Sequence, residues 1–178
     1  MRVAKVGAAA PEFALACADA RDDDRRSVCS SDYAGRWLML MFYPRDFSFV
    51  CPTELTSFSA RWPDFQQRNC ELLGISADAV ELHREWLTTP PAKGGLGPLQ
   101  FPLASDPDGA MARAYDVWVD EKHVSLRGLF LIDPDGILQY AVTHNLNVGR
   151  SPDEVLRVLD ALQTGGLCPA SWTSADGT

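Results

Sequence analysis

The chain alternates between short, continuous apolar runs and segments in which apolar residues recur every three or four positions. Residues 37–43 form such a run and end at Pro44, which is typical of a strand buried on both faces of a sheet. A second run, 71–76, predicts another buried strand. Helical spacing of apolar residues follows each run, first soon after residue 51 and then over 79–87. The order of strand then helix therefore occurs twice.

Prolines and glycines divide the middle of the chain. Pro63 lies within the first helical segment, where it lacks an amide donor, and it predicts a kink or break near residues 59–63, of which we expect a bend rather than an end of the helix. Residues 90–98 contain three glycines after two prolines, so we expect a surface loop. A short strand near 101–104 and a helix over about 108–115 are predicted to follow.

The last third of the chain predicts a hairpin and a final helix. Apolar runs at 129–133 and 137–143 flank the turn sequence Asp-Pro-Asp-Gly, which favours two antiparallel strands. Ser151 is a candidate N-cap for an amphipathic helix that ends near Gly165. We therefore expect an α/β fold, a mixed central sheet flanked by helices. It would form one domain over residues 1–178, in which 165–178 are a C-terminal tail.

Composition narrows the possible functions. Hydrophobic residues make up 46% of the 178 residues and charged residues 22%, as in an ordinary soluble globular protein. The formal net charge of -8 would repel phosphate backbones, so neither nucleic acid nor a membrane is an expected partner. The first thirteen residues lack the continuous apolar core of an export signal, and we expect a cytoplasmic protein.

The cysteines and histidines form no pattern that predicts a metal site or another cofactor. The cysteines contain neither a C-x-x-C pair nor a paired metal-ligand motif, and the histidines lack ligand spacing. In a reducing compartment the cysteines would be thiols, and any disulfide would be transient. We interpret the histidines as solvated polar residues. The residues are Cys17, Cys29, Cys51, Cys70 and Cys168, with His83, His123 and His144.

Cys51 has the context of a nucleophile. It directly precedes Pro52 at the beginning of a predicted helix, where unpaired backbone N–H groups and the helix dipole stabilise a negative charge. Such stabilisation matters because the thiolate, not the thiol, is the reactive form. The alternative, which residue type alone favours, is an inert core thiol at a junction of strand and helix.

The surrounding motif decides between these alternatives. Residues 42–54 read Phe-Tyr-Pro-Arg-Asp-Phe-Ser-Phe-Val-Cys-Pro-Thr-Glu and closely resemble the active-site motif of typical two-cysteine peroxiredoxins, including bacterial alkyl hydroperoxide reductase C. The resemblance implies a thioredoxin-like fold and the reduction of hydrogen peroxide and organic hydroperoxides. It covers nearly all of the chain after the first thirty residues and continues through Trp86, 94–98, 127–130, 149–151 and 168–172.

The resemblance implies a role for each residue of the site. Cys51 would be the peroxidatic nucleophile, whose thiolate attacks a peroxide oxygen and becomes a sulfenic acid. Pro44 would shield the sulfur from water, and the Ser48 hydroxyl would hydrogen-bond the peroxide. Arg127 would stabilise the thiolate and the charge that develops as the O–O bond breaks. The expected supporting residues are Glu54 and Arg150, which would orient Arg127, and Trp86.

Ser48 departs from the commonest pattern of the family, in which threonine stands at this position. Serine keeps the hydroxyl but lacks the methyl group that restrains the rotamer of threonine. We expect activity with a looser peroxide contact and a lower rate. Taken singly, this serine could instead cap a turn, Pro44 could end a strand, and Arg127 and Arg150 could lie on a solvated face.

Cys168 is the candidate resolving cysteine. Its Cys-Pro-Ala-Ser-Trp setting resembles the family's resolving site, in which the tail of one subunit reaches the peroxidatic cysteine of its partner. This implies an antiparallel homodimer, often a ring of five dimers, and local unwinding at Cys51, because a disulfide needs Cα atoms within about 7 Å. Thioredoxin or a dedicated flavoprotein disulfide reductase would then reduce the disulfide.

Three alternatives remain open. A thioredoxin-like disulfide exchanger is disfavoured because Cys51 has no second cysteine three residues beyond it, as a C-x-x-C pair requires. A one-cysteine peroxidase follows if Cys168 cannot reach its partner, and a non-enzymatic role would be that of a chaperone-like holdase or peroxide-sensing ring.

Within the family, easy overoxidation accompanies a Gly-Gly-Leu-Gly loop together with a C-terminal Tyr-Phe helix. This chain has the loop at 94–97 but no Tyr-Phe, so comparative resistance to overoxidation is expected.

Overall fold

A computed structural model describes residues 3–24 and 26–176, and residues 1, 2, 25, 177 and 178 of the expected domain and tail lie outside this range. Its centre is a seven-stranded mixed sheet in the order β2-β1-β5-β4-β3-β8-β9, beside which β6 and β7 form a two-stranded ribbon. The strands are β1 (Ala14–Ala18), β2 (Ser27–Cys29), β3 (Trp37–Phe42), β4 (Cys70–Ser76), β5 (Leu103–Ser105), β6 (Trp118–Val119), β7 (Val124–Ser125), β8 (Arg127–Ile132) and β9 (Leu138–His144).

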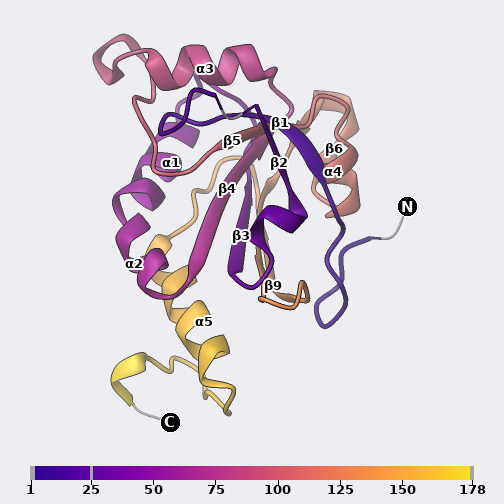
Figure 1. The fold of residues 1–178 in the computed structure, drawn as a ribbon, viewed down its shortest axis with the longest axis vertical. Helices are drawn as coiled ribbons and strands as arrows, with labels where there is room; N and C mark the ends of the chain where they lie inside the picture. Colours follow the sequence, from indigo (N-terminus) through magenta and orange to yellow (C-terminus); the bar gives the residue numbers. More distant parts are fainter. Residues whose placement is uncertain (1–2, 25, 177–178) are drawn as a thin grey trace.

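Helices cover both faces of this sheet (Figure 1). The predicted α/β class, a mixed sheet flanked by helices, is therefore confirmed. The α-helices are α1 (Cys51–Ala60), α2 (Trp62–Gln67), α3 (Val80–Thr88), α4 (Ala110–Ala114) and α5 (Pro152–Thr164). Short 3-10 helices are η1 (Ser30–Tyr33), η2 (Pro91–Lys93), η3 (Asp120–Lys122) and η4 (Ser174–Asp176).

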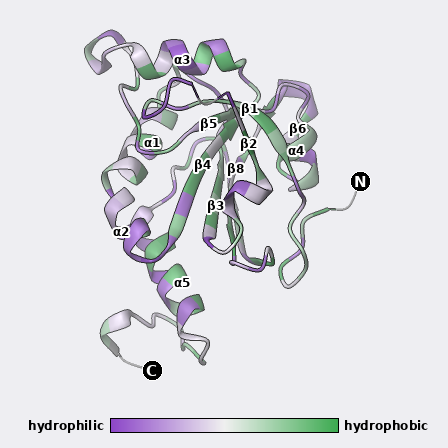
Figure 2. Ribbon diagram, in the orientation of Figure 1, coloured by the Kyte–Doolittle hydropathy of each residue, from purple (hydrophilic) through white to green (hydrophobic). Residues whose placement is uncertain are grey.

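The central strand β3 contributes to two hydrophobic cores. Successive residues of a strand point to opposite faces, so its continuous apolar run is buried on both sides. Met39 and Met41 pack with apolar residues of α1, α2, α3 and α5, whereas Leu40 and Phe42 pack with those of α4. Figure 2 shows the corresponding pattern, in which the central strands are largely hydrophobic and the outer helices alternate between hydrophilic and hydrophobic residues.

Strand directions bring distant segments to one edge of the sheet. β4 is parallel to β3, but β8 is antiparallel to it, with Met41 opposite Leu129. The beginning of β8 therefore lies beside the end of β3. β9 in turn runs antiparallel to β8 and pairs His144 with Arg127, so the segment after β9 returns to the same edge. This edge is where α1 begins.

The helix after β3 is interrupted rather than bent. α1 ends at Ala60 and α2 begins at Trp62, with Arg61 between them. Pro63 stands in the first turn of α2, where a missing amide donor removes no intrahelical hydrogen bond. The kink or break predicted near residues 59–63 is therefore a break, and the preference for a bend over an end of the helix was wrong.

The segment 90–98 is only partly a surface loop. Its first half includes η2 and is exposed, whereas Gly95, Leu96 and Gly97 are buried. Gly95 lies against the backbone of Thr89, where an added Cβ would come within 1.8 Å of the carbonyl oxygen. A side chain at this position would therefore clash, which explains glycine there more directly than flexibility does.

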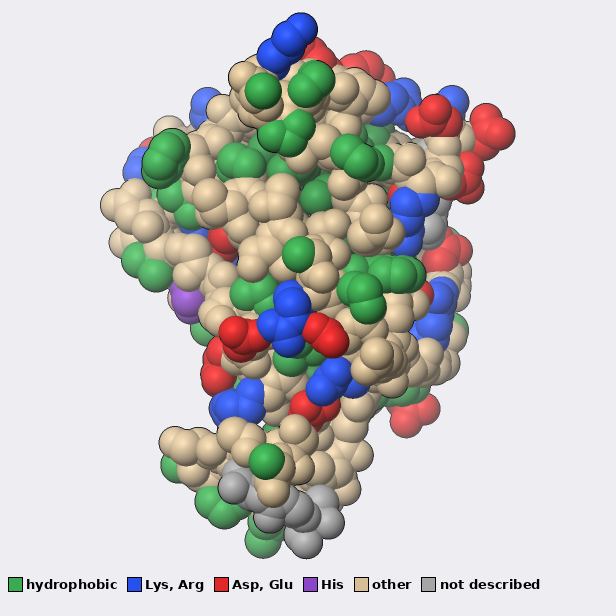
Figure 3. Space-filling model, turned by 90° about the vertical axis from the view of Figure 1, so that its left-hand side faces the viewer, with side chains coloured by type: hydrophobic (Ala, Val, Ile, Leu, Met, Phe, Trp, Pro, Cys, Tyr) green, Lys and Arg blue, Asp and Glu red, His purple; other side chains and the backbone are tan. Residues whose placement is uncertain are grey.

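Helix α5 agrees with its prediction, and ion pairs tie it to α2. Ser151 is its N-cap residue, although the serine side chain makes no capping hydrogen bond, and Gly165 ends it with φ of 66°. Asp153 pairs with Arg61, and Asp160 pairs with Arg68. Figure 3 views the face that carries α1 and α2 and shows basic and acidic side chains interspersed on it. Among the described residues, no helix is long and apolar enough to cross a membrane.

Candidate active site

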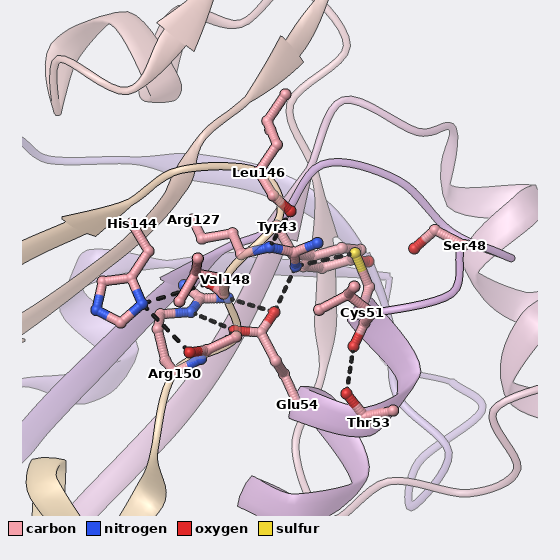
Figure 4. Close-up of polar contacts among 12 residues, drawn as sticks. Tyr43, Ser48, Cys51, Thr53, Glu54, Arg127, His144, Leu146, Val148 and Arg150 are labelled. Atoms are coloured by element: carbon pink, nitrogen blue, oxygen red, sulfur yellow. Dashed lines mark hydrogen bonds and ion pairs between the residues drawn. The ribbon is translucent and has the colours of Figure 1, made fainter.

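Cys51 is the first residue of α1, directly after the loop that leaves β3. Its side chain is fully buried, and its sulfur accepts a hydrogen bond from Nη1 of Arg127 at 3.3 Å (Figure 4). The N-terminal turn of the helix adds unpaired backbone N–H groups and the positive end of the helix dipole. The position therefore stabilises a thiolate from two directions.

Arg127 is held in place by three acceptors. It is the first residue of β8 and is almost fully buried. Its Nε donates to the carbonyl oxygen of Leu146 at 2.7 Å, and Nη1 donates to Oε2 of Glu54 at 2.5 Å as well as to the sulfur. These contacts fix the plane of the guanidinium group, so that its charge faces Cys51.

Glu54 and Arg150 form a buried ion pair behind Arg127. Oε1 of Glu54 accepts from the backbone N of Arg150 at 2.7 Å and from its Nε at 2.8 Å. Nη1 of Arg150 donates to the carbonyl oxygens of Phe42 and Gly128. Arg150 thus links α1, the end of β3 and the beginning of β8. The predicted group of Cys51, Glu54, Arg127 and Arg150 lies together in one cluster (Figure 4).

The environment of Glu54 favours its carboxylate form. Burial alone would raise the pKa of this carboxyl group, but the hydrogen bonds and charge of Arg150, together with the charge of Arg127, outweigh burial and lower the pKa below its usual value. The carboxylate and the guanidinium groups therefore stabilise one another in a site that excludes water.

A cavity of about 440 Å³ opens beside this cluster. Pro44, Ser48 and Arg127 line it, together with residues of η3 and the segment after β9. Figure 4 draws Ser48 and Arg127 on opposite sides of the sulfur. The Ser48 hydroxyl donates to the carbonyl oxygen of Arg45 at 3.0 Å, and its lone pairs and rotation leave it able to bond a ligand in the cavity.

Trp86 supports the site by packing against the segment between β3 and Cys51, and it is not among the residues that line the cavity. Its side chain is fully buried, and its ring lies 6.1 Å from that of Tyr43 and 5.8 Å from that of Phe47. Both neighbours belong to the segment that leads from β3 to Cys51. The structure therefore gives Trp86 a packing role in holding this segment.

The prediction that His83 is a solvated polar residue was wrong. His83 is fully buried, and its Nδ1 lies 2.6 Å from Oδ2 of Asp46, whose other oxygen accepts from the Tyr43 hydroxyl at 2.8 Å. His83 also lies 3.2 Å from the carbonyl oxygen of Ala104. Its position one turn before Trp86, on the apolar face of the helix, was the sequence signal for burial.

Cys168 lies apart from the cluster. Its sulfur is 3.7 Å from the carbonyl oxygen of Ala161 and 3.5 Å from Oγ1 of Thr164, both in the last turn of α5. The side chain is half-buried and its thiol is free. Within one chain, the structure therefore does not bring Cys168 to Cys51.

The remaining cysteines differ from Cys51 in their surroundings. Cys17 and Cys70 are fully buried, and Cys29 is half-buried next to η1. Burial, with the nearby charge of Glu71, raises the pKa of Cys70 far above its usual value, so this thiol stays protonated. Among the described residues, no cluster of three or more His, Cys, Asp or Glu side chains could hold a metal ion.

Comparisons with known proteins agree with this geometry. A family model described as the AhpC/TSA family matches residues 6–141. A peroxiredoxin-like protein from the rubredoxin operon of Clostridium pasteurianum is 47% identical, with 96% of each chain covered. Peroxiredoxin-2 of Bos taurus is 44% identical and covers 98% of this chain and 89% of its own.

A solved structure extends the likeness to the fold. The reduced 2-Cys peroxiredoxin of Plasmodium vivax superposes with a TM-score of 0.91 at 39% identity, over 97% of this chain and 90% of its own. The sheet and its flanking helices are thus the thioredoxin-like fold of peroxiredoxins. The chain belongs to the AhpC/TSA family and is a peroxiredoxin, an enzyme with peroxidase activity.

Proposed function

We propose that this peroxidase is of the two-cysteine type, with Cys51 as the nucleophile and Cys168 of the partner subunit as the resolving residue. The observation that carries the first assignment is the 3.3 Å contact between Arg127 and the Cys51 sulfur at the beginning of a helix. The same surroundings that stabilise a thiolate also stabilise negative charge during O–O cleavage.

In the first half-reaction the Cys51 thiolate attacks one oxygen of the peroxide. An S–O bond forms, the O–O bond breaks, and the leaving hydroxide or alkoxide takes a proton to become water or an alcohol. Cys51 is oxidised to a sulfenic acid. Arg127 stabilises the charge that moves to the leaving oxygen, Ser48 donates a hydrogen bond to the peroxide, and Pro44 limits access of water. Their common position on the wall of one cavity supports these roles.

In the second half-reaction the Cys168 thiol attacks the sulfenic sulfur, and a disulfide and one water molecule result. Cys168 lies beyond the last turn of α5 and is half-buried, so release of the tail from this helix would allow its free thiol to reach a neighbouring subunit. The proposed assembly is a homodimer, which can associate further into a decamer. Thioredoxin or a flavoprotein disulfide reductase supplies the electrons that restore both thiols.

A one-cysteine peroxidase is the second candidate. The free Cys168 thiol at the end of α5 is the specific observation that favours it. In that mechanism an external thiol reduces the Cys51 sulfenic acid directly, and peroxide consumption does not need Cys168.

A non-reducing gel after treatment with one equivalent of hydrogen peroxide separates the two candidates. The two-cysteine mechanism predicts a covalent dimer in the wild type and none in Cys51→Ser or Cys168→Ser. An uncrosslinked wild type that still consumes peroxide would establish the one-cysteine mechanism instead. Cys29→Ser, which alters another half-buried thiol, is the control and should crosslink normally.

A further inference from the structure

The cavity beside Cys51 is larger than hydrogen peroxide requires. Its volume of about 440 Å³ lies within the range of about 300–1,000 Å³ of sites that bind organic ligands. Pro44, Val124 and Leu146 form apolar parts of its wall. The cavity therefore has room, and suitable walls, for the organic part of a hydroperoxide whose O–O bond lies near Arg127.

The outer wall of this cavity is positively charged. Arg45 and Lys122 are both exposed and both line it, as does Glu121. Nη2 of Arg45 donates to the carbonyl oxygen of Lys122 at 3.2 Å, which holds the Arg45 guanidinium group beside the backbone of η3. Two cations against one carboxylate leave this wall with an excess of one positive charge, whereas the whole chain carries -8.

The charges of the buried cluster around Cys51 do not cancel the positive excess on the outer wall. Glu54 pairs with both Arg127 and Arg150, and the proposed mechanism adds the negative charge of the reacting Cys51 sulfur beside Arg127. An anionic group is therefore attracted to the outer wall rather than to the sulfur. This separation suits a molecule with a neutral hydroperoxide at one end and a negative charge at the other.

We propose that the cavity selects organic hydroperoxides that carry a carboxylate, which Arg45 and Lys122 bind while the hydroperoxide group meets Cys51. The proposal rests on the assignment of Cys51 as the nucleophile and adds the substrate class. The chemical step is the one described above, and the alkoxide that leaves becomes a hydroxy acid after it takes a proton from water.

The test compares 4-hydroperoxy-4-methylpentanoate with its methyl ester, which lacks the negative charge. Stopped-flow fluorescence follows the oxidation of Cys51 in fully reduced protein without a reductant, so docking of a reductase plays no part. We expect the acid to react several-fold faster than the ester in the wild type. Added salt should reduce this ratio, because both cations are exposed.

Variants Arg45→Gln and Lys122→Gln should each lower the ratio of the acid rate to the ester rate by a factor of about two to five, and the double variant should bring it close to one. Lys93→Gln, an exposed lysine of η2, is the matched control and should keep the wild-type ratio. The rate with the ester is the reference for each variant. A variant that reacts more slowly with both substrates therefore still gives a valid ratio.

Failure of the carboxylate proposal can be distinguished from failure of the Cys51 assignment. If hydrogen peroxide oxidises Cys51 but the acid and the ester react equally fast with the wild type, or the double variant keeps the wild-type ratio, the carboxylate proposal is wrong and the function of Cys51 stands. If Cys51→Ser retains the fast reaction with hydrogen peroxide, the assignment of the nucleophile itself is wrong.

Discussion

At the scale of single residues, Arg127 is the charged group in contact with the Cys51 sulfur. It touches the sulfur directly, and Glu54 and Leu146 keep its guanidinium group from turning away. The resemblance to peroxiredoxins implied this residue, together with Glu54 and Arg150. The motif could not predict the acceptor at Leu146, because a backbone carbonyl leaves no mark in the pattern of side chains.

Replacing Arg127 by Gln removes a positioned charge beside the sulfur. We expect the rate of Cys51 oxidation by hydrogen peroxide to fall by about a hundred-fold or more, as for the loss of one preorganised donor in other enzymes. Alkylation of Cys51 by iodoacetamide at neutral pH should also slow, since less thiolate is present. The control is Arg26→Gln, which replaces an exposed arginine distant from Arg127 in the sequence, and it should change neither rate. Unaltered alkylation in Arg127→Gln would contradict the proposed role.

The ion pair of Glu54 predicts an acid-sensitive contribution to stability. Its pKa in the folded protein is lowered, against about 4.3 for an unperturbed glutamate. Because the pKa of Glu54 is lower in the folded protein, its carboxylate stabilises the fold fully when the pH is above the pKa of the unfolded chain. This stabilisation is lost as the pH falls through the pKa of the folded protein. Urea titrations should therefore show the wild type losing stability below about pH 4.

Glu54→Gln should remove part of that pH dependence. At neutral pH we expect this variant to lose about 3–5 kcal/mol of unfolding free energy, because Arg150 stays buried without its partner. Glu81→Gln, at an exposed position of α3, should retain both the stability and the pH dependence. Equal slopes for wild type and Glu54→Gln between about pH 5 and pH 3 would exclude this source of acid sensitivity.

At the scale of elements, the tail docks on α5 at two points, which are Arg157 and the last turn of the helix, where the Cys168 sulfur contacts Ala161 and Thr164. Arg157 pairs with Glu154, and its Nη1 donates to the carbonyl oxygen of Trp172 at 3.0 Å. The Trp172 side chain is buried. Residues 168–172 are therefore held against the helix between two anchors, and Cys168 must leave this position to meet another sulfur.

Arg157→Ala should loosen the tail and favour disulfide formation. After a pulse of excess peroxide, mass spectrometry should find several-fold less Cys51 sulfinic acid than in the wild type, because a more accessible Cys168 captures the sulfenic acid sooner. Arg61→Ala removes another arginine that pairs with an acidic residue of α5, Asp153, and it is the control. An equal or larger sulfinic fraction in Arg157→Ala would show that the docked tail assists resolution.

The positions of the main strands were predicted well from the sequence, whereas the contacts between segments far apart in the sequence were not. The apolar runs gave β3, β4 and the hairpin of β8 and β9, since burial on two faces leaves a clear pattern. The antiparallel pairing of β3 with β8 needs contacts between residues about ninety positions apart in sequence. The buried pair of His83 and Asp46 depends on the same long-range packing.

At the scale of the whole molecule, the sheet places the site at one edge. The end of β3, the beginning of β8 and the return of the chain after β9 meet there, and α1 begins at the same point. Cys51, Arg127 and Arg150 are thus brought together by strand direction, although the motif around Cys51 is the only one of these segments with a strong local signature.

We propose that, of the five cysteines, Cys51 alone attacks peroxide. The most direct measurement uses Cys168→Ser, treated with one equivalent of hydrogen peroxide in the presence of dimedone, followed by peptide mapping of all cysteines. We expect a dimedone adduct on Cys51 and none on Cys17, Cys29 or Cys70. An adduct on one of those three, with Cys51 unmodified, would contradict it.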